Sequence, residues 1–273
     1  LCNRNSVIFS DKLNHASLNE AAILSRAKLI RYNHLDLDHL ETLIKGNLIK
    51  RKIILTDGVF SMDGDMADIP GLVYLCEKYD ATLYVDDAHG YGVLGSSGQG
   101  ILEYYEDESL ISNESRNLII YMFTLGKSIG VSGAMLCAKE EIIEYCIQKS
   151  KPYIYTTAAP AYIASGAITS MNIIKKDMRL RKKLKLLIEL FRLKIRNKST
   201  LTQSKTAIQP ILINDLERAI SISSQLIELG FLVPVIKPPT VPAGTSRLRV
   251  SISALHTRKE IISLTSAINS LMS

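Results

Sequence analysis

Short apolar runs and amphipathic stretches alternate along the chain. Each apolar run has the length of a buried strand, and the stretches between them repeat apolar residues at helical spacing. The expected strands are residues 7–9, 29–31, 53–56, 81–85, 118–123 and 133–138, and the expected helices are residues 17–28, 37–44, 70–79, 140–149, 160–175 and 179–198. Strands that alternate with helices of this size predict an α/β fold, with a largely parallel sheet flanked by helices.

Two helix ends carry signals of their own. Ser17-Leu18-Asn19-Glu20 has the spacing of a capping box, which predicts that the first helix opens there. Gly46 follows the helix expected over 37–44 and is typical of a helix end.

A different order of elements follows the polar stretch 197–205. The pattern predicts, in turn, a strand at 208–213, a helix at 216–229, strands at 231–236 and 247–252, and a helix at 257–271. This order is that of a compact α+β domain. We therefore expect a large domain over residues 1–198 and a C-terminal α+β domain over residues 199–273.

Composition adds little to this picture, since 47% of the residues are hydrophobic, 22% are charged and tryptophan is absent. The net charge of +6 arises mainly between residues 175 and 198, on one face of an expected amphipathic helix. Without an aromatic platform or binding motif, this basic face favours solvent exposure over nucleic-acid binding. No apolar run reaches the ~18 residues that span a membrane, so we expect neither nucleic acid nor membrane as a partner.

The four cysteines contain no CxxC pair. Cys76 and Cys146 lie in apolar helical patterns and Cys137 lies in an apolar strand, so we expect buried thiols and a reducing cytoplasm. The chain begins at Leu1 and soon enters a strand, which is typical of the middle of a domain.

The candidate catalytic and cofactor-binding residues lie directly after two of the expected strands. The strand that ends at Val85 is followed by Asp86 and, three residues later, by His89. The strand over 118–123 is followed by Thr124-Leu125-Gly126-Lys127. Because ligands bind beyond the carboxyl ends of parallel strands, these groups are expected to share one cleft.

An acid, an imidazole and a lysine in one cleft indicate an aldehyde cofactor held as a Schiff base. A lysine that is partly desolvated can form an imine, and a pyridoxal ring needs a carboxylate to keep its pyridine nitrogen protonated. Lys127 and Asp86 are the candidates for these roles. A metal site formed by Asp86, Asp87 and His89 is the alternative, although no further histidine or glutamate cluster completes a coordination shell.

Three other positions carry possible ligand groups. Ser61 lies in the loop after the strand 53–56, where its position is also explained by turn formation. His15 precedes the first helix and fits either a structural role or stacking on a pyridoxal ring. Alternation puts Arg247 and Arg249 on one face of their strand, where they either face solvent or bind a carboxylate in a bidentate manner.

Four segments together carry a resemblance to a known family: Asn14-His15-Ala16-Ser17, Thr56-Asp57-Gly58-Val59-Phe60-Ser61-Met62-Asp63-Gly64, Val85-Asp86-Asp87-Ala88-His89-Gly90 and Thr124-Leu125-Gly126-Lys127. The chain resembles, over essentially its whole length, the α-oxoamine synthases. These enzymes use pyridoxal 5'-phosphate to condense an amino acid with an acyl thioester. The resemblance implies the fold of type I pyridoxal-phosphate transferases, with an incomplete large domain.

The resemblance also implies how the cofactor is held. Lys127 would form the Schiff base and act as the base at the substrate Cα, and Asp86 would pair with the pyridine nitrogen. His89 and Ser61 would contact the phenolic oxygen, and His15 would stack on the ring.

Further roles follow from the same resemblance. Thr124 would bind the phosphate, with Thr156 or Thr157 reaching in from the partner subunit of a homodimer. Arg249 would bind the substrate carboxylate, with Thr240 nearby. Compared with the family, the sequence lacks an N-terminal part that holds a substrate-binding arm, a substrate-contacting arginine and a phosphate-binding glycine loop.

Within the family, Ala207-Ile208-Gln209-Pro210, the segment 238–245 and Gly90-Tyr91-Gly92 are most similar to the branch that serves biotin synthesis. That branch implies decarboxylative condensation of L-alanine with a pimeloyl thioester, carried on coenzyme A or acyl carrier protein. The alternatives are a sister enzyme that uses glycine or serine, and a non-catalytic subunit of this fold. Such a subunit would be expected to lose the lysine, which is present here as Lys127.

Overall fold

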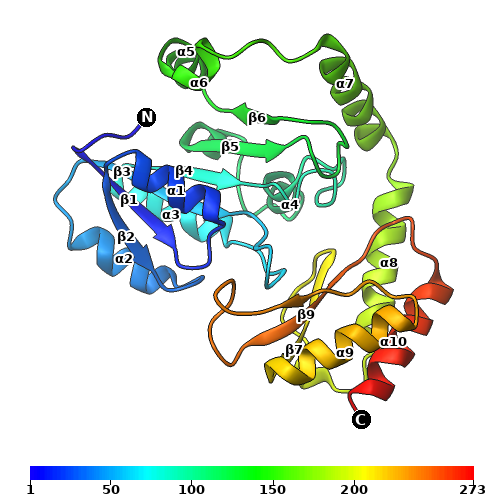
Figure 1. Cartoon of the computed structure of the whole chain (residues 1–273). Coiled ribbons are helices and arrows are strands. Elements are labelled where there is room, and N and C mark those ends of the chain that lie inside the picture. Colours follow the sequence, from blue (N-terminus) through cyan, green and yellow to red (C-terminus); the bar gives the residue numbers. More distant parts are fainter. The chain divides into compact units, whose positions relative to one another are not determined.

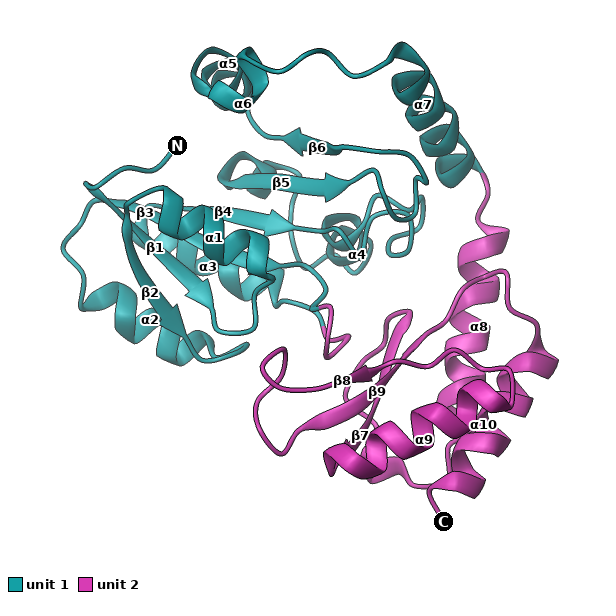
Figure 2. Ribbon diagram, viewed as in Figure 1, with its two compact units in different colours: residues 1–60, 66–176 teal, residues 61–65, 177–273 magenta.

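The computed structural model describes residues 1–273, which form two compact units (Figure 2). Unit 1 consists of residues 1–60 and 66–176, and unit 2 consists of residues 61–65 and 177–273. Each unit has its own sheet.

The sheet of unit 1 has six strands in the order β2-β1-β3-β4-β5-β6 (Figure 1). They are β1 Ser6–Asp11, β2 Lys28–Tyr32, β3 Arg51–Asp57, β4 Ala81–Asp86, β5 Ile119–Thr124 and β6 Ala134–Cys137. The first five strands are parallel, and only β6 runs antiparallel to its neighbour β5. The expected largely parallel sheet is confirmed.

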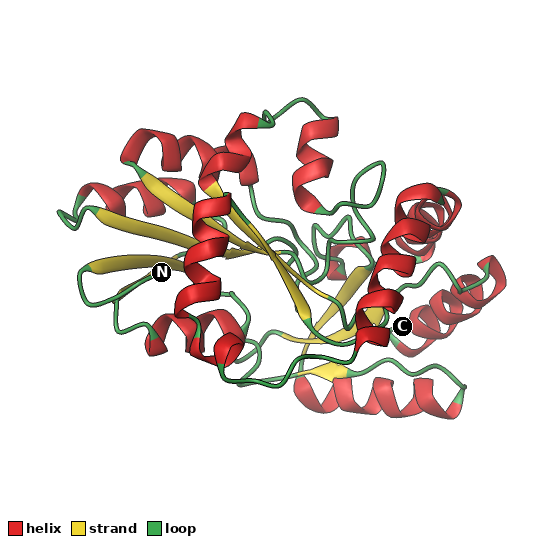
Figure 3. Ribbon diagram, turned by 90° about the horizontal axis from the view of Figure 1, so that it is seen from above, coloured by secondary structure: helices red, strands yellow, loops and turns green.

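Helices cover both faces of this sheet (Figure 3). The helices of unit 1 are α1 Ala16–Leu24, α2 Leu37–Lys45, α3 Ile69–Tyr79, α4 Ile101–Asp107, α5 Glu140–Lys149, α6 Lys151–Ile154 and α7 Ala161–Lys176, with a 3₁₀ turn at Glu114–Leu118. Of these, α5 and α6 contribute no buried residue. Alternation along β1 divides the core, because Val7 and Phe9 pack with residues of α2, α3 and α4 while Ile8 packs on the α1 side. The sequence pattern did not indicate α4, which is seven residues long and has no side-chain cap.

The first helix begins differently from the expectation. The predicted capping box at Ser17 is wrong, because His15 is the N-cap residue and its side chain accepts a hydrogen bond from the Ser17 N–H. The helix ends at Leu24, since the chain must turn before β2 begins at Lys28. The expected end of α2 at Gly46 is confirmed.

Unit 2 pairs a three-stranded antiparallel sheet with three helices. The strands β7 Ile208–Asn214, β8 Val235–Ile236 and β9 Ser246–Ser251 have the order β7-β9-β8. The helices are α8 Arg179–Lys194, α9 Leu216–Glu228 and α10 Arg258–Leu271, with a 3₁₀ turn at Lys198–Thr200. The expected α+β character of the C-terminal part is confirmed, although the strand expected over 231–236 is limited to Val235 and Ile236.

The division between the units lies at 176/177, whereas the polar pattern places a domain boundary at 198/199. The reason is α8, whose contacts are with α10 and whose Leu184, Leu187 and Phe191 are buried. The polar stretch after α8 contributes to unit 2 as well, because Thr202 and Thr206 donate hydrogen bonds to the backbone of the segment 61–65.

The sequence also predicts which cysteines are buried and that no segment spans a membrane. Cys76 is buried as expected, but the buried thiol expected at Cys137 is wrong, because this residue is exposed on the edge strand β6. None of the helices is both long enough and apolar enough to cross a membrane.

Candidate active site

Four adjacent parallel strands of unit 1 end in polar residues at one edge of the sheet. Asp11, Asp57, Asp86 and Thr124 are the last residues of β1, β3, β4 and β5. The carboxyl edge of a parallel sheet is where α/β folds bind ligands, because the loops that follow the strands open there.

Lys127 and His89 meet at this edge. The Lys127 Nζ lies 2.8 Å from the His89 Nε2, although the two residues come from the loops after different strands. Lys127 is exposed, in contrast to the partly desolvated lysine expected from the sequence, and His89 is half-buried. An amine that is held by an imidazole and open to solvent can be reached by an aldehyde.

Asp86 supplies the carboxylate of the site. Its side chain is 5% exposed, and one carboxylate oxygen accepts a hydrogen bond of 3.1 Å from the Ala88 N–H. Burial has the largest effect and raises the pKa of Asp86, while the Ala88 N–H and the positive charges of Lys127 and His15 act to lower it. Asp86 is therefore a buried acid placed within the electrostatic reach of the lysine.

A second buried acid, Asp57, lies in register with Asp86 on the adjacent strand. Its carboxylate accepts a hydrogen bond of 2.9 Å from the backbone N–H of His15. Burial, together with the charges of Asp86 and Asp11, raises the pKa of Asp57 to about 8. The strand pattern alone gives Asp57 no role, although this residue ends an apolar strand in the same way as Asp86.

Asp87 does not share the surroundings of Asp86. It is fully buried, and its Oδ2 accepts hydrogen bonds from the Tyr121 hydroxyl and, at 2.8 Å, from the Ile101 N–H. No group of three or more histidine, cysteine or acidic side chains is placed to hold a metal ion. The alternative of a metal site on Asp86, Asp87 and His89 therefore has no support in this geometry.

The threonines predicted to bind phosphate lie in two different settings. Thr124 accepts a hydrogen bond of 3.2 Å from the Gly126 N–H and donates one of 3.3 Å to the Gly133 carbonyl, so it shapes the turn that carries Lys127. Thr156 and Thr157 are exposed in the stretch between α6 and α7.

The remaining predicted site residues belong to unit 2. Arg249 donates a hydrogen bond of 2.6 Å to the Ser61 carbonyl, and burial lowers its pKa. Arg247 also contacts the segment 61–65, through an ion pair with Asp63, and is only 4% exposed. The two arginines thus share a face, but Arg247 is committed to Asp63, which leaves Arg249 as the candidate for a substrate carboxylate. Thr240 is exposed.

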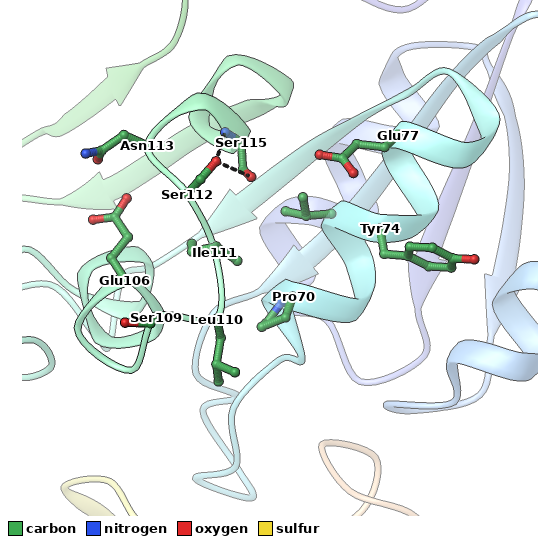
Figure 4. Close-up of a pocket in the computed structure, with 11 residues that line it drawn as sticks. Pro70, Tyr74, Glu77, Glu106, Ser109, Leu110, Ile111, Ser112, Asn113 and Ser115 are labelled. Carbon is green, nitrogen blue, oxygen red and sulfur yellow. Dashed lines mark hydrogen bonds between the residues drawn. The ribbon is translucent and has the colours of Figure 1, made fainter.

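A groove of about 650 Å³ lies elsewhere on unit 1 (Figure 4). It is formed by one side of α3, including Tyr74 and Glu77, and by the segment 106–115. None of the predicted site residues lines it. Glu106, one of the residues that line the groove, is paired with Arg116 at 2.6 Å.

Comparison with known proteins identifies the relatives of the chain. Residues 1–268 match the family described as aminotransferase class I and II. The 8-amino-7-oxononanoate synthase of Methylobacillus flagellatus is 50% identical over 262 residues, which cover 96% of this chain and 64% of that protein. The synthase of Nitrosomonas europaea is 45% identical over 99% of this chain and 69% of that protein. The chain thus spans about two thirds of the length of these relatives.

Solved structures give the same picture. The serine palmitoyltransferase of Sphingomonas wittichii aligns with a TM-score of 0.90 and 26% identity, over 99% of this chain and 67% of that chain. The 8-amino-7-oxononanoate synthase of Francisella tularensis aligns with a TM-score of 0.85 and 32% identity, over 100% of this chain and 77% of that chain.

The expected fold and cofactor are confirmed by these matches, since a structure of SPT with PLP also aligns over 99% of the chain with a TM-score of 0.89. The family match, the fold and the named relatives all agree with the resemblance carried by the segments around His15, Asp57, Asp86 and Lys127. The chain therefore belongs to the 8-amino-7-oxononanoate synthase family of pyridoxal-phosphate enzymes.

Proposed function

We propose that this protein condenses L-alanine with a pimeloyl thioester, with loss of carbon dioxide, to form 8-amino-7-oxononanoate for biotin synthesis. The observation that carries the proposal is the contact of 2.8 Å between Lys127 Nζ and His89 Nε2, beside the buried Asp86. The names of the relatives from Methylobacillus and Nitrosomonas support the choice of reaction.

The residues at the sheet edge fit pyridoxal phosphate. The cofactor presents an aldehyde, a pyridine nitrogen and a flat ring, and the edge presents an exposed amine, a buried carboxylate and two imidazoles. When bound, pyridoxal phosphate supplies an electron sink for the charge left when a bond to the substrate Cα breaks. Lys127 would bind the aldehyde carbon, and Asp86 would hold a proton on the pyridine nitrogen.

The protein's own groups would then move one proton at the substrate. Lys127 is the candidate base for the Cα proton, because it is the amine that binds the cofactor's reactive carbon. His89 holds the Lys127 Nζ by its hydrogen bond and so fixes the direction from which the amine approaches. His15, the N-cap of α1, would cover one face of the ring.

The other assignments form part of the same proposal. Ser61 would contact the phenolic oxygen, Thr124 would bind phosphate, and Arg249, with Thr240, would bind the substrate carboxylate. A homodimer in which Thr156 or Thr157 reaches the partner's site, an acyl donor on coenzyme A or acyl carrier protein, and a cytoplasmic location complete the proposal.

The cofactor assignment is tested by absorbance. Adding pyridoxal phosphate to the protein should give the visible band of a lysine imine, and Lys127→Ala should abolish that band. Lys139→Ala is the matched control, because Lys139 is also exposed but lies at the start of α5. A band that survives in Lys127→Ala would remove Lys127 from this role.

The reaction assignment needs a substrate comparison. Alanine with pimeloyl thioester should turn over faster than glycine with acetyl-CoA or serine with palmitoyl-CoA. A preference for glycine or serine would assign the chain to a sister activity. Cofactor binding without turnover of any pair would favour a non-catalytic subunit.

A further inference from the structure

The loop between β1 and α1 is fastened to β3 by the side chain of Asn14. The paired registers of β1 and β3 end at Ser10 and Leu55. Beyond that point the Asn14 Nδ2 donates to the Leu55 carbonyl at 2.8 Å, and its Oδ1 accepts from the Asp57 N–H at 2.9 Å. The carboxamide, which is 5% exposed, thereby continues the hydrogen bonding of the sheet for one more step.

Asp57 in turn accepts a hydrogen bond from His15, the residue after Asn14. Its Oδ2 accepts a hydrogen bond of 2.9 Å from the backbone N–H of His15. His15 is the N-cap of α1, so this N–H has no partner within the helix and needs an external acceptor. Asp57 is only 4% exposed, so water has little access to the His15 N–H. Loss of the Asp57 acceptor would therefore leave this N–H without a hydrogen bond, which costs free energy.

The two contacts run in opposite directions between the same two segments. Asn14 bonds the backbone of Asp57, and Asp57 bonds the backbone of His15. The His15 ring is held as well, since its Nδ1 lies 2.8 Å from the Ser17 hydroxyl. Both the backbone and the ring orientation of His15 are therefore fixed at the sheet edge that carries Asp86 and Lys127.

We propose that Asn14 and Asp57 form a reciprocal clamp that positions His15 against the cofactor, which makes Asp57 a positioning residue that acts through His15. The inference rests on the proposed function, because it takes His15 as the residue that covers the pyridoxal ring. It adds a cause for the placement of His15, which neither the helix pattern nor the family segments supply.

The test is a double-mutant cycle on cofactor affinity. Visible titration with pyridoxal phosphate gives a dissociation constant for the unaltered protein, Asp57→Ala, His15→Ala and the double variant. Loss of the acceptor should weaken binding about tenfold in Asp57→Ala. In the His15→Ala background the same change should have less than a twofold effect, because Asp57 would have no ring left to position.

Two further variants separate the clamp from general stability. Asp57→Asn keeps an oxygen that accepts from the His15 N–H, so it should restore affinity to within about twofold of the unaltered protein. Thr56→Val is the matched control, since it removes a buried hydroxyl that donates to the Asp57 carbonyl, a group with no part in the clamp, and it should leave affinity unchanged. Amide exchange of the His15 N–H should rise in Asp57→Ala but stay slow in the other two variants.

The outcomes are distinct. Equal weakening by Asp57→Ala with and without the His15 ring would overturn the inference, as would failure of Asp57→Asn to restore affinity. An unchanged dissociation constant in Asp57→Ala would overturn it too. If the unaltered protein shows no Lys127-dependent band at all, the proposed function fails instead, and the exchange rate of the His15 N–H still tests the clamp.

Discussion

The Asp57 carboxyl should make stability depend on pH in a direction opposite to that of most carboxylates. Burial and the charges of Asp86 and Asp11 raise its pKa to about 8, with Lys127 acting to lower it. The unfolded chain releases this proton near pH 4. Between about pH 4 and pH 8 the folded state therefore binds more protons, so the free energy of unfolding contributed by Asp57 falls as pH rises.

Asp57→Asn should reduce that fall, because an amide carries no proton to lose. Urea midpoints measured at pH 5 and pH 8 by circular dichroism should differ less in the variant than in the unaltered protein. Asp36→Asn is the control, since hydrogen bonding at the start of α2 lowers the pKa of Asp36 and it stays ionised across this window. If the urea midpoint changes by the same amount between pH 5 and pH 8 in the unaltered protein and in both variants, Asp57 is ionised in the folded state.

Residues whose location follows from their position along a strand can be predicted from the sequence. The shared location of Lys127 and Asp86 at one sheet edge could be predicted, because each follows an apolar run and parallel strands bring such ends together. Asn14 could not, because its role depends on the turn that carries its carboxamide back to Leu55. The surroundings of Asp87 could not be predicted either, since it lies in the loop after β4 and its partners Ile101 and Tyr121 come from later elements.

At the scale of elements, Asp87 joins α4 to the sheet. Its carboxylate accepts from the N–H of Ile101, the first residue of α4, and from the hydroxyl of Tyr121 on β5. Burial has the largest effect on Asp87 and raises its pKa to about 7. Its other carboxylate oxygen is buried without a hydrogen-bond partner, so the group depends strongly on the partners that it has.

Tyr121→Phe should therefore cost about 1–3 kcal/mol of unfolding free energy, because it removes a donor from a fully buried acid. Tyr105→Phe is the matched change, as the Tyr105 hydroxyl donates to the Ala67 carbonyl in a half-buried setting. That loss should cost only about 0.5–1.5 kcal/mol. Urea denaturation compares the two, and equal costs would show that Asp87 is not an essential link.

Most elements of unit 1 could be predicted because apolar runs and helical spacing are local properties of the sequence. The α4 helix was not, since its seven residues begin after Gly100 without a side-chain cap and are held by Asp87 from a distant loop. The N-cap of α1 lies two residues before the predicted one, because His15, rather than the serine of the expected box, caps the helix.

At the scale of the whole molecule, the short segment 61–65 interrupts unit 1 in the sequence. It is flanked by residues of unit 1 but belongs to unit 2. The ion pair of Asp63 with Arg247 and the hydrogen bonds from Thr202, Thr206 and Arg249 account for this. A domain boundary drawn from a polar stretch cannot reveal such a segment, because the contacts join residues more than a hundred positions apart.

A substitution at Gly64 tests whether the segment 61–65 supports the sheet of unit 2. Its φ is +70°, and a Cβ there would lie 2.3 Å from the Ile208 carbonyl oxygen, which belongs to the backbone of β7. Gly64→Ala should therefore lower the free energy of unfolding by about 2–4 kcal/mol, from left-handed strain and from the displacement of β7.

Gly244→Ala is the control, since Gly244 also has a positive φ but open space around it, and should lower the free energy of unfolding by only about 1–2 kcal/mol. Hydrogen exchange should quicken in β7 and β9 of Gly64→Ala, far along the chain from the substitution. Equal exchange in the two variants would mean that the segment 61–65 does not support unit 2.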